Sequence, residues 1–291
     1  MIGYLSLAVI LTAFCMVANR LSTTIVTAPM IFLALGVGMA HLDVLPLEQA
    51  HGALHLVAEV ALVVLLFLDA AQIDQRALTR RNVWPARMLV IGLPLCVMFG
   101  VAAGMLLLPG WPLAVILVVA CILAPTDAAL GQPVIANADI PERPRRALTV
   151  ESGLNDGLAL PLVLMSAALV ASEEAVARAD WLLFAFKQIT LGPLAGLAVG
   201  TLGGFVLLWA KRVNATSDIY EGIGALSLAA TAYLTAGIIG GNGFIAAFVA
   251  GLGFGGVVRG RCAFVYEFTE GEGQLLAWAA FFLLGALLVP E

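Results

Sequence analysis

Long apolar runs recur along almost the whole of this 291-residue chain. Hydrophobic residues make up 62% of the sequence and charged residues only 11%, whereas an average soluble domain has about 25% charged residues. Each run is close to the length of about 20 residues that crosses a bilayer as a helix. The runs are continuous rather than alternating, which favours helices over a barrel. The sequence therefore predicts an all-α integral membrane protein, a multi-span helical bundle.

We expect about ten membrane spans in one transmembrane domain that covers residues 1–291. The first run lacks a positively charged leader, so we interpret it as a span rather than a cleaved signal peptide. The connection between the eighth and ninth spans is only GGNG, at residues 240–243, which makes that pair the least secure. The expected spans are residues 4–18, 25–40, 55–71, 87–108, 113–137, 148–171, 181–209, 222–239, 244–258 and 274–289.

Basic residues are confined almost entirely to alternate connections between these spans. Basic loops stay in the cytoplasm, so the pattern places the N-terminus outside the cell. We expect the protein in the plasma membrane, which in a bacterium is the inner membrane. The residues of these connections are Arg20, Arg76, Arg80, Arg81, Arg87, Arg143, Arg145, Arg146, Lys211, Arg212, Arg259 and Arg261.

Five acidic side chains lie inside the expected spans, where an ionisable group costs several kcal/mol and usually faces an interior or a water-filled cavity. They are Glu59, Asp69, Asp127, Glu151 and Asp156. Lys187 is the single basic residue near a span that could match them. The cluster therefore predicts a cation path, and the alternative is that each acid is paired or sits at a span end.

The stretch ESGLNDGLALP places Glu151, Ser152, Asn155 and Asp156 in the sixth span. Residues i and i+4 share a helix face, so Ser152 lies beside Asp156 and Glu151 beside Asn155. A hydroxyl one turn before a carboxylate suits Na⁺, K⁺ or a proton. Glu151 is rotated by roughly 140° from Asp156, so we expect it to pair with a base on another helix.

The fifth span is interrupted. Pro125 removes a backbone donor and disfavours helical geometry at Ala124, and Thr126 and Asp127 follow it directly. A simple proline kink is one interpretation. We prefer a discontinuous helix near residues 113–137, because unwound carbonyls and half-helix ends near the membrane midplane hold coupling ions in secondary transporters.

These residues resemble a known family. APTDAALGQPVI followed by ESGLNDGLALPLV looks like the ion-site signature of the NhaP-type sodium/proton antiporters, within the monovalent cation:proton antiporter superfamily. LVVLLFLDAAQID, GGNGFIAAFVAGLGFGG and EFTEGEGQLLAWAAFFLLGALL resemble further helices of that family. The likeness extends over nearly the whole chain.

The resemblance implies a role for each matching position. Asp156 would be the essential acid that holds either cation or proton, with oxygen ligands from Ser152, Thr126 and Asp69. Asp127 would balance a positive half-helix end, Asn155 would brace the site, and Glu151 would pair with an arginine on a later helix. The Asn-Asp pair goes with electroneutral exchange in related antiporters.

The resemblance also implies the partners. These are H⁺ with Na⁺, and Li⁺ or K⁺ as further cations, in a lipid bilayer, with no cofactor and no nucleic acid. The family has about thirteen helices in two inverted repeats, whereas this chain ends after the tenth expected span, without the second crossing helix. We therefore expect a partial domain, truncated at its C-terminus.

A potassium/proton exchanger or a channel-like protein with regulatory domains elsewhere is the alternative, and no enzyme motif is present. GLGFGG matches a dinucleotide-binding pattern only formally, because no strand precedes it. A glycine ladder in the seventh span predicts close helix approach, either within one protomer or in the homodimer that we expect; its members are Gly192, Gly196, Gly200 and Gly204.

Overall fold

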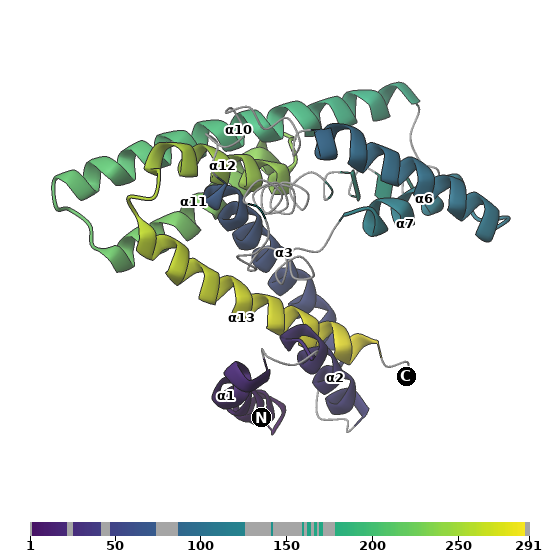
Figure 1. Ribbon diagram of the computed structural model, residues 1–291, viewed down its shortest axis with the longest axis horizontal. Helices are drawn as coiled ribbons and strands as arrows, with labels where there is room; N and C mark the ends of the chain where they lie inside the picture. Colours follow the sequence, from purple (N-terminus) through teal and green to yellow (C-terminus); the bar gives the residue numbers. More distant parts are fainter. Residues whose placement is uncertain are drawn as a thin grey trace. The chain divides into compact units, whose positions relative to one another are not determined.

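The structure is a computed structural model that describes residues 2–21, 26–41, 47–73, 87–125 and 178–288, with residues 141, 159, 162–163, 166–167 and 169–170 between them. All regular secondary structure in these residues is helical (Figure 1). The predicted all-α architecture is thereby confirmed for the described part of the chain.

The helices follow the expected spans closely. Only α3 and α13 begin well before their expected spans, because polar turns precede the apolar part of each helix. By length and composition, Gly52–Gln72 and Phe186–Arg212 of the described chain could each cross a membrane. The helices are α1 (Ile2–Leu21), α2 (Ala28–His41), α3 (Leu47–Gln72), a π-helical turn η1 (Met88–Gly92), α6 (Leu93–Leu107), α7 (Leu113–Leu123), α10 (Arg178–Arg212), α11 (Asp218–Ile238), α12 (Gly243–Val258) and α13 (Ala263–Leu287).

The chain forms two compact units. The first comprises Met1–Leu65 and Phe268–Glu291. Its core is aromatic: Phe14 of α1 meets Phe32 of α2 edge to face, with 5.2 Å between ring centroids, and Trp278 of α13 stacks on Phe32 at 5.4 Å. Such pairs add about 0.5–1.5 kcal/mol each beyond the area they bury. Interlocked rings therefore hold α1, α2 and α13 together.

The second unit, Leu66–Glu267, contains the end of α3 and the helices from α6 to α12. Within it α10, α11 and α12 pack against one another (Figure 1). Helix α12 is rich in glycine and alanine, and most of it is buried. On one side it meets the end of α3, where a Cβ on Gly251 would overlap the carbonyl oxygen of Phe67. Small residues thus let α12 lie in the middle of the unit.

The glycine ladder of α10 packs on α12. A Cβ on Gly196 would overlap the carbonyl oxygen of Ala246, and one on Gly200 would overlap that of Ala250. A Cβ on Gly192 would lie 2.8 Å from the carbonyl oxygen of Asn242. Of the two readings of the ladder, close packing within the protomer is the one that these contacts support.

The short GGNG connection does separate two helices. Gly240 adopts a positive φ of 78°, which glycine tolerates without steric cost. Asn242 then caps α12, because its side-chain oxygen accepts a hydrogen bond from the backbone N–H of Ile245 at 3.0 Å. The eighth and ninth expected spans are therefore distinct helices, α11 and α12.

Candidate functional site

Asp69 is the one predicted ion-site residue that lies in the described chain. It occupies the last turn of α3 and is half-buried. Its neighbours Phe67 and Ala70 are 1% exposed, and Phe67 packs on Phe254 of α12 with 5.4 Å between ring centroids. The packing of α3 against α12 therefore fixes the helical turn that carries the Asp69 carboxylate.

The interrupted span behaves as Pro125 predicts up to the limit of the described residues. Helix α7 ends at Leu123, just before Pro125. Cys121 of α7 is buried, and its side chain hydrogen-bonds that of Ser166 in the sixth expected span. The other predicted site residues lie outside the described residues, namely Thr126, Asp127, Glu151, Ser152, Asn155 and Asp156.

Glu59, a further acid of the third span, has a local partner. His55 lies one turn before it on α3, and its Nδ1 is 3.4 Å from the Glu59 carboxylate oxygen. The His55 side chain is exposed, whereas that of Glu59 is half-buried. Glu59 belongs to the first compact unit and Asp69 falls in the second.

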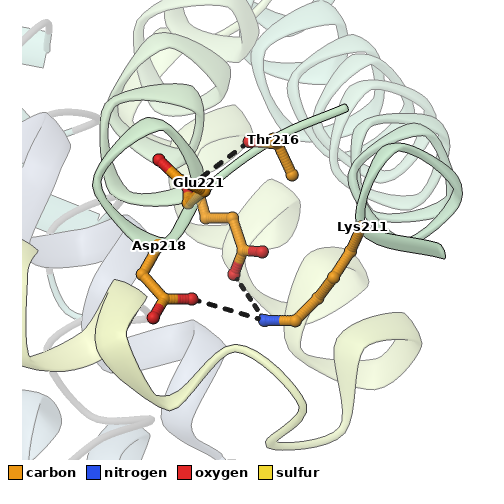
Figure 2. A network of polar contacts seen from close by, with 5 residues as sticks. Lys211, Thr216, Asp218 and Glu221 are labelled. Atoms are coloured by element: carbon orange, nitrogen blue, oxygen red, sulfur yellow. Dashed lines mark hydrogen bonds and ion pairs between the residues drawn. The ribbon is translucent and has the colours of Figure 1, made fainter. Parts of the chain in front are cut away.

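A charge cluster around the buried Glu221 joins the end of α10 to the first turn of α11 (Figure 2). Lys211 donates a hydrogen bond of 2.8 Å from Nζ to the Glu221 carboxylate, and its Nζ lies 3.8 Å from Oδ1 of Asp218. Glu221 is only 1% exposed, whereas the Lys211 side chain is 38% exposed. Water can therefore reach the ammonium group but not the carboxylate that it neutralises.

Cys262 completes this cluster from the turn between α12 and α13. It is 1% exposed. Burial, a hydrogen bond to the Glu221 carboxylate and the charge of that carboxylate together raise the pKa of its thiol to about 11. One buried carboxylate thus ties the α10–α11 connection to the α12–α13 connection.

The chain matches the family described as "Sodium/hydrogen exchanger, transmembrane" over residues 6–291. It belongs to the sodium/hydrogen exchanger family. The predicted likeness to NhaP-type antiporters is confirmed, and with it the integral membrane character of the chain.

The chain is also similar to individual antiporters of this family. It is 31% identical to the K(+)/H(+) antiporter NhaP2 of Shewanella oneidensis, over 99% of this chain and 50% of the relative. It is 28% identical to the K(+)/H(+) antiporter NhaP of Alkalimonas amylolytica, over 81% of this chain and 40% of the relative. The chain thus spans about half the length of the curated relatives that it matches.

The structure of the sodium proton antiporter MjNhaP1 from Methanocaldococcus jannaschii at pH 8 shares the fold. It superposes with a TM-score of 0.73 over 98% of this chain and 70% of that one, at 20% identity. This exchanger-family chain therefore has the NhaP-type antiporter fold that its motifs predicted.

The role of Glu221 was not predicted from the sequence. The eighth span was expected to begin at Gly222, which left Glu221 in a connection, whereas α11 begins at Asp218. Two signals pointed to it: Asp218 and Glu221 are spaced as in the first turn of a helix, and Lys211 closes the preceding span. Acids in a first turn are favoured by the helix dipole.

Removing the two partners of this ion pair is expected to have unequal effects. Lys211→Met leaves the Glu221 carboxylate buried without its cation and should cost about 2–3 kcal/mol. Glu221→Gln leaves a half-exposed ammonium group that water solvates, and should cost about 1 kcal/mol or less. Thermal unfolding of the purified protein measures both, with Lys211→Arg as the charge-preserving control. Equal losses for the two substitutions would contradict the asymmetry.

The Cys262 thiol should make stability fall at alkaline pH. Its pKa in the folded chain is about 11, above the ordinary 9.0, so the unfolded chain loses the thiol proton first. The contribution is complete below about pH 9 and is lost between about pH 9 and pH 11. The melting temperature of Cys262→Ser should fall less steeply across that window than that of the unsubstituted protein. Cys15→Ser is the control, and parallel curves for all three would refute the assignment.

Proposed function

We propose that this chain carries the ion-binding half of a secondary transporter that exchanges a monovalent cation, K⁺ or Na⁺, for protons. The observation that carries the proposal is the family match over residues 6–291, in a chain whose sequence also contains the Thr126-Asp127 pair and the Asn155-Asp156 motif. The relatives named K(+)/H(+) antiporters favour K⁺ as the transported cation. The fold neighbour is named a sodium proton antiporter, so Na⁺ is the second candidate.

The proposed chemistry is competition at Asp156. Burial disfavours a carboxylate charge, whereas a bound cation favours it, so the group holds a proton or a metal ion but not both. Ser152, Thr126 and Asp69 supply further oxygen ligands in this proposal, and Asp127, Asn155 and Glu151 support the helices that carry them. If only the neutralised site crosses the membrane, one cation is exchanged per proton.

Competition makes a direct kinetic prediction. Lowering the pH should raise the apparent Km for the transported cation by up to about tenfold per pH unit, because protons occupy the same carboxylate. The measurement is cation-triggered collapse of a preformed pH gradient in everted vesicles, from a host without its own antiporters. KCl, NaCl, LiCl and choline chloride are compared, using this chain and any longer reading frame that contains it.

The outcomes of that assay separate the proposals. Collapse by KCl alone or NaCl alone identifies the cation, whereas collapse by choline chloride as well indicates a leak. A Km that is independent of pH contradicts shared occupancy of Asp156. Cation flux that needs no proton gradient or counter-ion favours the channel-like alternative.

We further propose the bacterial inner membrane as the location, with the N-terminus outside. The basic residues in alternate connections support this orientation. A homodimer is part of the proposal, but the α10 ladder is not its interface, because those glycines pack on α12. Cysteine labelling of position 2 from outside intact cells tests the orientation.

A further inference from the structure

A cavity of about 490 Å³ lies between the C-terminal ends of α10 and α12. Three arginines line it: Arg212 from the last turn of α10, and Arg259 and Arg261 from the connection that follows α12. All three are exposed. Three guanidinium groups around one cavity create a strongly positive site.

No acid is among the described residues that line this cavity. Within the described ranges, neither Arg212 nor Arg261 forms an ion pair, whereas the adjacent Lys211 is already paired with Glu221 and Asp218. Arg259 donates from Nε to the carbonyl oxygen of Gly256 at 3.0 Å, which anchors its side chain at the cavity rim. An anion of matching size would complete the charge balance.

The remaining walls are apolar and open. Phe205 and Trp209 of α10 line the cavity and are 62% and 64% exposed. Trp209 lies one turn from the end of a helix that is apolar enough to cross a membrane, and tryptophan is enriched at the headgroup level of bilayers. The site therefore offers guanidinium donors beside a surface suited to acyl chains.

We propose that this cavity binds the phosphate headgroup of an anionic phospholipid of the cytoplasmic leaflet. Guanidinium groups bind phosphate oxygens with two parallel hydrogen bonds, and basic pockets between membrane helices on the cytoplasmic side suit such headgroups. A free phosphate ion would share the arginines but gain nothing from Phe205 and Trp209. A phospholipid fits both parts of the cavity, because its phosphate suits the arginines and its acyl chains suit the apolar wall.

The test is the thermal stability of the intact protein in neutral detergent during titration with phosphatidylglycerol. Phosphatidylcholine, glycerol 3-phosphate and inorganic phosphate are titrated in parallel. Phosphatidylglycerol alone should raise the melting temperature, and the double substitution Arg212→Gln/Arg261→Gln should weaken its apparent affinity by roughly tenfold or more. Arg87→Gln is the matched control, because Arg87 is an exposed arginine of another basic connection and should leave the affinity unchanged.

Two results of this titration overturn the proposal. An equal rise with inorganic phosphate identifies a free anion as the ligand, and an affinity that survives the double substitution places the lipid elsewhere. A second measurement does not depend on folding of the double variant. The fluorescence of Trp209 is obtained by subtracting the signal of the Trp209→Phe variant from that of the unsubstituted protein. Phosphatidylglycerol with brominated chains should quench this fluorescence more than brominated phosphatidylcholine does. Equal quenching by the two lipids would also overturn the proposal.

Discussion

Asp156→Ala is expected to reduce cation-driven proton release in everted vesicles to the background of vesicles without the protein. The proposed mechanism has one group that holds cation and proton in turn, so its loss removes both half-reactions rather than lowering affinity for one. Asp156→Glu keeps the carboxylate but moves it by one methylene, and should retain partial exchange with a raised Km.

The matched control for this substitution is Asp218→Asn. Asp218 is an acid with a side chain that is 69% exposed, near Lys211 rather than in the ion site. It should keep full activity, which excludes a general effect of removing one negative charge. Residual cation-dependent exchange in a well-expressed Asp156→Ala protein would assign the shared site to another carboxylate, with Asp69 the first to test.

Gly200→Val is expected to give the largest loss of stability. A Cβ at this position would overlap the carbonyl oxygen of Ala250 on α12, and backbone atoms cannot move aside as a flexible side chain can. Overpacking of a core costs about 1–3 kcal/mol where side chains can adjust, so a clash with the main chain should exceed about 3 kcal/mol. Helix α10 would have to separate from α12.

Gly237→Val is the control, because nothing lies within 4 Å of a Cβ on Gly237 in α11. Both substitutions place a β-branched residue in a helix, so their helix propensities match. Detergent-solubilised yield and melting temperature should fall for Gly200→Val and stay near the parent values for Gly237→Val. Equal behaviour would mean that α10 and α12 are not packed through this glycine.

The positions of the apolar helices were predictable because they depend on local chemistry. The bilayer requires apolar runs of about 20 residues, and such runs can be read directly from the sequence. Pro125 predicted that a helix ends near Ala124, and α7 ends at Leu123. The GGNG connection made the eighth and ninth spans the least secure pair, and the structure separates them through the positive φ of Gly240 and the Asn242 cap, which involve only neighbouring residues.

The ion site stays a prediction made from residue types, and of its residues only Asp69 lies in the described chain. Asp69 was recognised because a carboxylate in an apolar run is costly. Glu221 escaped that argument, since it stands at the edge of a run, where a charge is normally solvated. Its burial depends on the turn that brings Lys211 to 2.8 Å and on Cys262, 41 residues later in the chain, as the sequence numbers show.

The sequence by itself determined that the chain is a helical membrane protein with acids in its spans, because desolvation and helix length act on each segment separately. Only the tertiary structure decided which helices and which charged side chains contact one another. The glycine ladder of α10 predicted that another helix packs closely against it. That this helix is α12 depends on small residues on both helices, which no single segment encodes. The arginine-lined cavity likewise exists because the ends of α10 and α12 converge, and charges distant in sequence share a site only after helices have packed.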